Sequence, residues 1–208
     1  SNFTNRLIDA SAPHKHFLSE NPHFCRSALS RYTAQDFIEL MKSYDIPFHE
    51  KHKGQLFCDR SSEDLIQMLL QECDKGGVVR WQGCGVKAIA SEDAGYNLQT
   101  DQGEVHAGAV VIATGGLSIP QIGATDFGYR IASQYGLRLV SRRAGLVPLT
   151  FDGAEWAPYA SLAGLSLPVS IETGAKKTLM RFDEDLLFTH RGLSGPAVLQ
   201  ISSYWQEG

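Results

Sequence analysis

The sequence predicts an α/β protein whose second part is mainly β, and three patterns carry this prediction. Apolar residues recur at helical spacing over much of the first 75 residues. Three β-like runs separated by Asp- and Gly-containing turns follow over residues 86–107 and predict an antiparallel meander. Residues 109–113 are apolar at every position, which is typical of a strand covered on both faces inside an α/β sheet.

Three helices are expected in the first part. The first is predicted over residues 22–32, where apolar residues recur every four positions after an Asn-Pro pair. Thr33 and Asp36 have the spacing of a capping box at the start of the second helix. The third is expected from residue 61 to the glycine pair at 76–77.

Further strands and helices complete the predicted order. A short strand is expected over residues 78–81, and a helix over residues 127–135 should follow the buried strand. From residue 144 the strands are short and are separated by Gly, Pro and acidic turns, so we expect two domains, residues 1–143 and 144–208. In the second domain we expect strands over 146–149, 167–171, 177–182 and 186–189, an exposed acidic turn at 183–185, and a final helix over 196–204.

Composition and charge narrow the function classes. The 208 residues include 19 Lys and Arg against 23 Asp and Glu, a net charge of −4, so neither a nucleic-acid nor an anionic-membrane surface is predicted. No apolar run approaches the roughly 20 residues of a membrane span. The four cysteines form no CxxC pair, which favours reduced thiols in a cytoplasmic protein. The chain starts with Ser1 rather than Met and stops after a segment of structured character, so we interpret it as an internal piece of a longer protein.

A candidate cofactor site lies at the end of the predicted buried strand, where Thr114, Gly115 and Gly116 follow Ala113. Ligands in open α/β sheets bind outside the carboxyl ends of the strands, and glycine leaves room for close approach of a cofactor to the backbone. A tight turn from strand to loop is the structural alternative for this tripeptide.

The stretch around Val86 resembles the G-x-x-V-x-x-I segment of flavoproteins, whose valine backbone faces the adenine of FAD; an ordinary hairpin strand is the alternative. Five further stretches are NFTN at 2–5, GQLF at 54–57, ATGGLSIP at 113–120, LVPL at 146–149 and LFTHRGLSGPAVLQIS at 187–202. Together and in this order, they resemble motifs of the BaiN/YhiN-type family of FAD-dependent oxidoreductases, the aminoacetone-oxidase-like flavoproteins.

The resemblance implies a flavin enzyme that transfers hydride to a small organic substrate, with FAD in a split Rossmann-like domain interrupted by a β-rich domain. It implies NAD(P)H as a possible electron donor and a cytoplasmic location. The family's N-terminal GxGxxG unit and C-terminal segment are absent, so the piece alone should be inactive and the missing portions are its expected partners. The cofactor-binding residues implied are Asn2, Val86, Ala113, Thr114, Gly115 and Gly116.

The rival interpretation is a non-catalytic β-rich ligand-binding or interaction module.

The family's Gly-Asp pair is replaced by Asp126 and Phe127, which argues against a flavin contact at Asp126. His190, Arg191 and Ser194 are candidates for binding an anionic substrate group, and His190 is the candidate catalytic proton carrier; a structural turn is the alternative. The histidines at 14 and 16 lack a third ligand, so no metal site is predicted.

Overall fold

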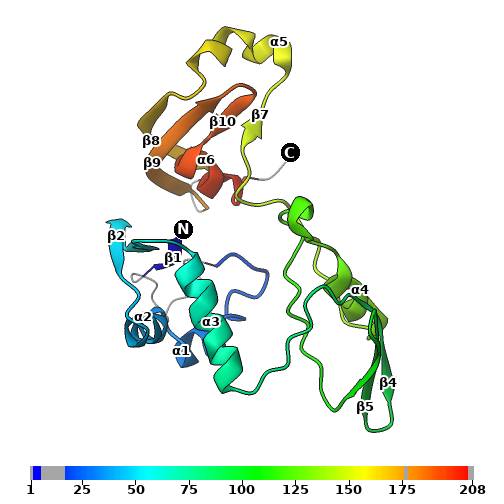
Figure 1. Cartoon of the computed structure of the whole chain (residues 1–208). Coiled ribbons are helices and arrows are strands. Elements are labelled where there is room, and N and C mark those ends of the chain that lie inside the picture. The colour runs from blue at the N-terminus through cyan, green and yellow to red at the C-terminus, as the bar shows by residue number, and fades with distance from the viewer. Residues whose placement is uncertain (1, 6–16, 176–177, 206–208) are drawn as a thin grey trace. The chain divides into compact units, whose positions relative to one another are not determined.

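The computed structural model describes residues 2–5, 17–175 and 178–205 (Figure 1). The chain divides into two compact units, Ser1–Val140 and Ser141–Gly208. The division thus falls between residues 140 and 141, whereas the predicted boundary lies between 143 and 144.

The first unit contains a three-stranded antiparallel sheet with the strand order β1-β3-β2. Its strands are β1 (Asn2–Asn5), β2 (Phe48–His52) and β3 (Gln55–Cys58). Three helices belong to the same part of the chain, namely α1 (Arg26–Arg31), α2 (Ala34–Ser43) and α3 (Glu63–Lys75). Met41 of α2, Met68 of α3 and Cys58 of β3 meet with Ile46 in a buried apolar cluster that joins these elements.

The capping box predicted for the second helix is confirmed at the start of α2. Thr33 Oγ1 accepts the backbone N–H of Asp36 at 3.2 Å, and Asp36 Oδ2 accepts the backbone N–H of Thr33 at 2.6 Å. The carboxylate of Asp36 also accepts the Thr33 hydroxyl at 2.7 Å. The bond from the backbone N–H of Thr33 and then the bond from its hydroxyl hold the pKa of the Asp36 carboxyl below its ordinary value.

The helix predicted over residues 22–32 is shorter than expected. Phe24 and Arg26 donate their backbone N–H groups to carbonyls three residues earlier, at 3.0 and 3.1 Å, so this stretch forms turns. The helix α1 begins only at Arg26. The third helix lies where it was predicted. Its residues Leu65 and Met68 face the core, whereas Ile66 and Leu69 are about half exposed.

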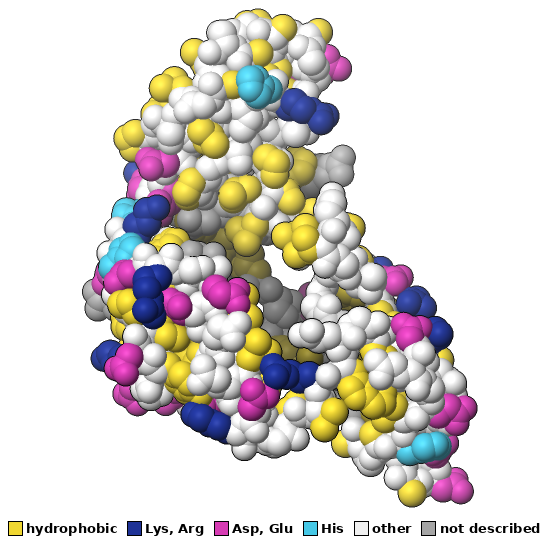
Figure 2. All heavy atoms as spheres, viewed as in Figure 1, with side chains coloured by type: hydrophobic (Ala, Val, Ile, Leu, Met, Phe, Trp, Pro, Cys, Tyr) yellow, Lys and Arg dark blue, Asp and Glu magenta, His cyan; other side chains and the backbone are white. Residues whose placement is uncertain are grey.

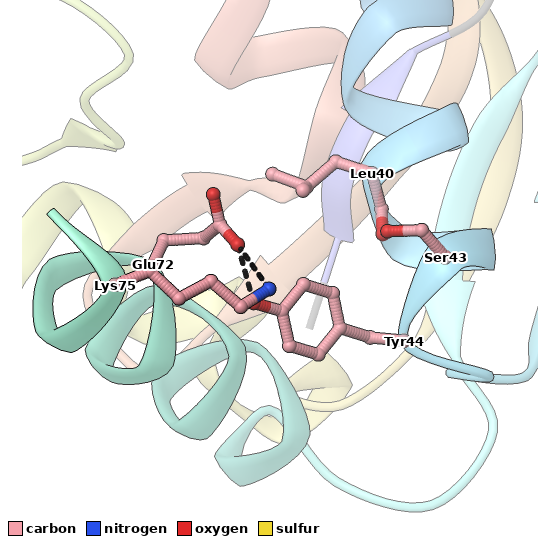
Figure 3. Close-up of polar contacts among 5 residues, drawn as sticks. All are labelled: Leu40, Ser43, Tyr44, Glu72 and Lys75. Carbon is pink, nitrogen blue, oxygen red and sulfur yellow. Dashed lines mark hydrogen bonds and ion pairs between the residues drawn. The ribbon is translucent and has the colours of Figure 1, made fainter.

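The ends of α2 and α3 are joined by three polar side chains (Figure 3). The hydroxyl of Tyr44 donates to the carboxylate of Glu72, and the ammonium of Lys75 donates to the Tyr44 oxygen at 2.7 Å and to Glu72 at 3.0 Å. The same ammonium lies 4.5 Å from the centroid of the Tyr44 ring. Hydrogen bonds from Tyr44 and then Lys75 hold the pKa of Glu72 below its ordinary value of 4.5, and bonds to Tyr44 and then Glu72 raise that of Lys75.

This arrangement predicts a pH-dependent effect of Glu72→Gln. Because the pKa of Glu72 is lowered by folding, its stabilising contribution is complete above about pH 4.5 and is lost as the pH falls through the folded-state pKa. Thermal unfolding should show a lower Tm for Glu72→Gln than for wild type at pH 7, and the difference should vanish in acid. Glu39→Gln on the exposed face of α2 controls for the lost charge. A Tm difference that does not change with pH would contradict the assignment.

The second part of the first unit is the predicted antiparallel meander, and this prediction is confirmed. Its strands are β4 (Val86–Glu92), β5 (Gly95–Thr100) and β6 (Gly103–Ala107), and they are followed by the short helix η2 (Pro120–Ile122) and by α4 (Phe127–Gln134). The end of α4 is attached to this sheet: Gln134 Nε2 donates to the carbonyl of Ile89 at 2.6 Å, and Ser91 Oγ bonds the hydroxyl of Tyr135 at 3.1 Å.

The strand predicted over residues 109–113 is not formed, and this prediction is wrong for the described residues. The segment is extended but pairs with none of the described strands, and Val111 is 87% exposed. Uniform apolarity indicates that a segment is suited to burial between layers, but a strand also needs a neighbour to take up its backbone hydrogen bonds. The short strand predicted over residues 78–81 is also absent, since this stretch is an exposed connection.

The second unit is built on a four-stranded antiparallel sheet with the strand order β7-β10-β9-β8 and with α6 packed against it (Figure 1). The elements are β7 (Leu149–Thr150), α5 (Gly153–Trp156), η3 (Ala157–Leu162), β8 (Ser166–Thr173), β9 (Met180–Thr189), β10 (Gly192–Ser194) and α6 (Gly195–Ser202). The buried side of α6 carries Ala197, Val198, Ile201 and Ser202.

The acidic turn predicted at residues 183–185 is wrong. All three residues lie in the middle of β9, which is one long strand instead of the two predicted. They pair with β8, Asp183 opposite Ser170 and Asp185 opposite Pro168. Asp183 and Asp185 are exposed on one side of the strand, so the ladder of backbone pairs overrides their low strand propensity without burying them.

Two glycines allow the backbone to pack closely in the second unit. A Cβ on Gly192 (φ +152°) would collide with the carbonyl of Leu149 on β7. A Cβ on Gly195 (φ +87°) would lie 2.7 Å from the Asp185 carbonyl and 2.8 Å from the Leu187 nitrogen on β9. The GLSGP sequence therefore meets a packing requirement of this sheet and its helix.

We predict that Gly195→Ala destabilises the second unit. A left-handed backbone and a backbone collision both oppose the added methyl, with a cost on the order of 1–3 kcal/mol. Urea unfolding followed by the fluorescence of the buried Trp156 would measure it. Gly153→Ala in α5, where a Cβ meets nothing within 4 Å, is the matched control and should stay near wild type. Equal stability of the two variants would contradict the packing argument.

Candidate functional site

An apolar pocket of about 480 Å³ lies in the first unit between the meander, residues 109–116, here called the extended segment, and α4. This volume is within the usual range of small-molecule sites, about 300–1,000 Å³. The pocket is lined by Cys84, Val86, Ile89 and Leu98 of the meander and its approach, by Val110, Val111, Ile112 and Thr114 of the extended segment, and by Gly123, Thr125, Phe127 and Arg130 around α4.

The meander side of the pocket is held by Asp101. Its carboxylate accepts the backbone N–H of Gly85 at 2.8 Å and the ammonium of Lys87 at 2.8 Å, and its own N–H donates to the Gly85 carbonyl at 3.1 Å. The bond to Lys87, followed by that to Gly85, holds the pKa of Asp101 below its ordinary value. A Cβ at residue 85 would lie 2.9 Å from this carboxylate. These contacts fix the start of β4, so Cys84 and Val86 have defined positions at the pocket.

The helical side depends on a close approach at Gly128 of α4. A Cβ there would lie 3.2 Å from Ile112 Cγ2 and 3.5 Å from Thr114 Oγ1. The distance to Ile112 is tighter than most Cβ contacts, so glycine lets α4 come this near to the extended segment without displacing the Ile112 side chain. The approach brings Phe127 and Arg130 to the pocket from the same helix.

Gly115 differs from Gly128, because it has open space beside it. Its φ is +72°, a conformation that favours glycine, and a Cβ would meet no atom within 4 Å. The turn after Thr114 therefore needs glycine for its backbone, and it leaves an unfilled volume next to a residue that lines the pocket.

Few polar groups reach the pocket, namely Thr114, Thr125 and Arg130. The guanidinium of Arg130 is 3.0 Å from the carboxylate of Asp126 and lies 5.6 Å from the centroid of the Phe127 ring. Asp126 is thus paired with Arg130 and is not among the lining residues.

The predicted cofactor residues fall in three places. Val86 and Thr114 line one pocket although they are far apart in sequence, and Ala113, Gly115 and Gly116 lie on the same extended segment. Asn2 lies elsewhere, in β1, where its backbone pairs with Phe57. Of the residues that line the pocket, the sequence reasoning named only Val86 and Thr114 as cofactor residues; Leu98, Phe127 and Arg130 are among those that it missed. For Phe127, the adjacent Gly128 is a signal of close helix packing that was available in the sequence.

The substrate candidates His190, Arg191 and Ser194 belong to the second unit. His190 and Arg191 form the turn between β9 and β10, whereas Ser194 is the last residue of β10 and precedes α6. An extended strand rises about 3.3 Å per residue, so about 10 Å of β10 separates the turn from the helix start. The structure therefore does not support a joint anion site of His190 with the N-terminus of α6.

Among the described residues, no three His, Cys, Asp or Glu side chains are grouped so that they hold a metal ion, and the histidines at 14 and 16 lie outside those residues. Within the same residues, no helix has the length and apolar character to cross a membrane.

Comparison with known proteins gives the class of this chain. A family model described as the HI0933-like protein Rossmann domain matches residues 1–180, so the chain belongs to the HI0933-like Rossmann-domain family. This confirms the predicted α/β, Rossmann-like class, although all strand pairs among the described residues are antiparallel.

Two curated relatives are similar over the whole chain. The ribosomal RNA dihydrouridine synthase of Escherichia coli K12 is 49% identical over 207 residues, which cover 100% of this chain and 50% of the relative. The ribosomal RNA dihydrouridine synthase of Haemophilus influenzae Rd is 46% identical over 209 residues, which cover 99% of this chain and 50% of the relative. The chain thus spans about half the length of the curated relatives it matches.

Proposed function

We propose that this chain is part of an FAD-dependent oxidoreductase that reduces uridine in ribosomal RNA to dihydrouridine, and that its first unit binds the adenosine part of FAD. The pocket at Val86 and Thr114 is the observation that carries the cofactor proposal. The names and the identity of the two curated relatives support the substrate. The remaining half of the relatives' length is where we expect the rest of the flavin site.

The residues of the pocket fit an adenosine group. Aliphatic side chains of Val86, Leu98 and Ile112 offer apolar surface to an aromatic base, and β4 is an edge strand whose outer side is unpaired within the described residues. Thr114 supplies a hydroxyl, and the open space beside Gly115 leaves room for the cofactor along the backbone.

The chemistry that FAD supplies when bound is hydride transfer, which together with one proton saturates the C5–C6 double bond of uridine, with NAD(P)H as the class of donor that restores reduced flavin. The residues of this chain would bind and orient FAD. Val86 and Ile112 would exclude water from the pocket, and Thr114 would offer a hydrogen bond to the cofactor. We keep the cytoplasmic location as part of the proposal.

A second candidate is a small organic substrate instead of RNA. The net charge of −4 favours it, because binding to nucleic acid draws much of its affinity from basic side chains. We prefer RNA because the two relatives carry the same name at 46–49% identity. The non-catalytic module is a weaker alternative, since the family match extends from residue 1 to residue 180 and so includes most of the β-rich unit.

The cofactor proposal predicts that Gly115→Val in the full-length protein sharply lowers the bound FAD. A branched side chain would occupy the open space beside Thr114. Gly103→Val is the matched control, because Gly103 also has a positive φ and a free space around its Cβ but lies outside the pocket. The measurement is the absorbance of bound flavin relative to the protein concentration. Equal loss of FAD in both variants would assign the effect to backbone strain.

The substrate proposal predicts that the full-length protein, loaded with FAD and supplied with NAD(P)H, forms dihydrouridine in ribosomal RNA taken from cells that lack its gene. Mass spectrometry of nucleosides measures the product, and RNA incubated without NAD(P)H is the control. Absence of dihydrouridine, together with NAD(P)H oxidation that depends on a small carbonyl or enone compound, would favour the second candidate.

A further inference from the structure

The turn between β9 and β10 is held on three sides. Inside the turn, Thr189 Oγ1 accepts the backbone N–H of Arg191 at 3.3 Å and donates to the carbonyl of Gly192 at 2.9 Å. Outside it, the indole N–H of Trp156 donates to the Thr189 carbonyl at 2.9 Å, and the backbone N–H of Phe151 donates to the Arg191 carbonyl at 3.2 Å. Hydrogen bonds therefore hold the backbone on either side of His190, while His190 and Arg191 are both exposed.

An aromatic cluster lies directly beside this turn. Trp156, itself buried, stacks on Phe151 with centroids 4.9 Å apart and an angle of 10° between the rings, and it contacts Tyr159 at 5.3 Å and Phe188 at 6.0 Å. Phe151 and Tyr159 remain 43% and 49% exposed. Two aromatic rings thus present free surface on a buried, hydrogen-bonded support.

The charges around the cluster are mixed. Figure 2 shows a histidine and a basic side chain among apolar ones on the part of the second unit that carries α5, with an acidic side chain at the edge. Asp152 accepts the backbone N–H of Ala154 at 2.9 Å as the cap of α5, and Glu155 lies exposed on the same helix. One guanidinium beside two carboxylates does not attract the dense phosphates of a duplex. Exposed rings with a single cation suit bases that are free to stack.

We infer that Phe151, Tyr159, His190 and Arg191 form a surface that binds a single-stranded segment of the RNA substrate, the rings stacking on bases and Arg191 contacting a phosphate. The inference rests on the proposed function, since the relatives' names supply the RNA. It also explains how a chain with a net charge of −4 binds RNA: stacking, rather than bulk charge, provides the affinity, so the salt dependence is shallow.

The test uses the full-length protein and a short, fluorescently labelled, single-stranded RNA rich in uridine, with anisotropy measured over a range of salt concentrations. Tyr159→Ala should weaken binding about fivefold or more, the loss of one stacked base. Arg191→Gln should reduce the slope of log K against log salt by about 0.7, the loss of one phosphate contact. Tm values of both variants are measured alongside, and Arg191→Gln, an exposed change on a turn held by backbone bonds, keeps the test independent of folding.

The matched control is Arg181→Gln at the other end of β9, where the arginine is 3.5 Å from Glu172 and 3.2 Å from Asp183. It makes the same charge change and should leave binding and slope unchanged. Cross-linking of RNA that contains 4-thiouridine, mapped by mass spectrometry, should mark peptides that carry Tyr159 or Arg191. Wild-type binding in both test variants, or an equal effect of Arg181→Gln, would overturn the inference.

The results distinguish a failure of the RNA-binding surface from a failure of the proposed reaction. Wild-type protein that binds RNA here but forms no dihydrouridine would refute the proposed function and leave the surface standing. Dihydrouridine formed with unchanged kcat/KM by Tyr159→Ala and Arg191→Gln would refute the surface and leave the function standing. FAD content should be the same in wild type and in both variants.

Discussion

The close approach of α4 to the extended segment at Gly128 is the contact on which the candidate site depends. The meander side of the pocket is held separately, by the contacts of Asp101 with Gly85 and Lys87. The segment that carries Thr114 has no strand beside it among the described residues, so its position against the pocket relies on the helix. A Cβ at residue 128 would press on the side chain of Ile112, so either that side chain or the helix with Phe127 and Arg130 would have to shift by a few tenths of an ångström.

Local rules of the sequence predicted the local structure well. The capping box at Thr33 and the turns of the meander depend on residues close together in the chain, so the spacing alone identified them. The errors are of another kind. The expected burial of residues 109–113 and the expected turn at 183–185 depended on a neighbouring strand, missing in the first case and present in the second. The sequence of a segment alone does not show whether another strand lies beside it.

Residues of the candidate site were likewise predictable only where they belong to a local motif. Val86 and Thr114 were named because each belongs to a short motif, the one at the start of β4 and the other at the end of the strand that was predicted over residues 109–113 but is not formed. Phe127 and Arg130 reach the pocket through the packing of a helix, which no pattern of polar residues reveals. In the second unit, the sequence motifs that pointed to an anion site are largely explained by Gly192 and Gly195, whose backbones touch β7 and β9. The turn with His190 and Arg191 then stands apart from the helix with which it had been grouped.

The exposed apolar segment also has a consequence for the handling of this protein. Residues 109–114 read AVVIAT, without charge or proline, and Val111 lies almost fully open to solvent. Short stretches of high β-propensity with unpaired backbone groups pair readily with copies of themselves, which is the first step of aggregation. A strand that paired with this segment would take up its backbone hydrogen bonds and would also prevent self-association. Without such a strand, the protein should aggregate under conditions in which both units are still folded.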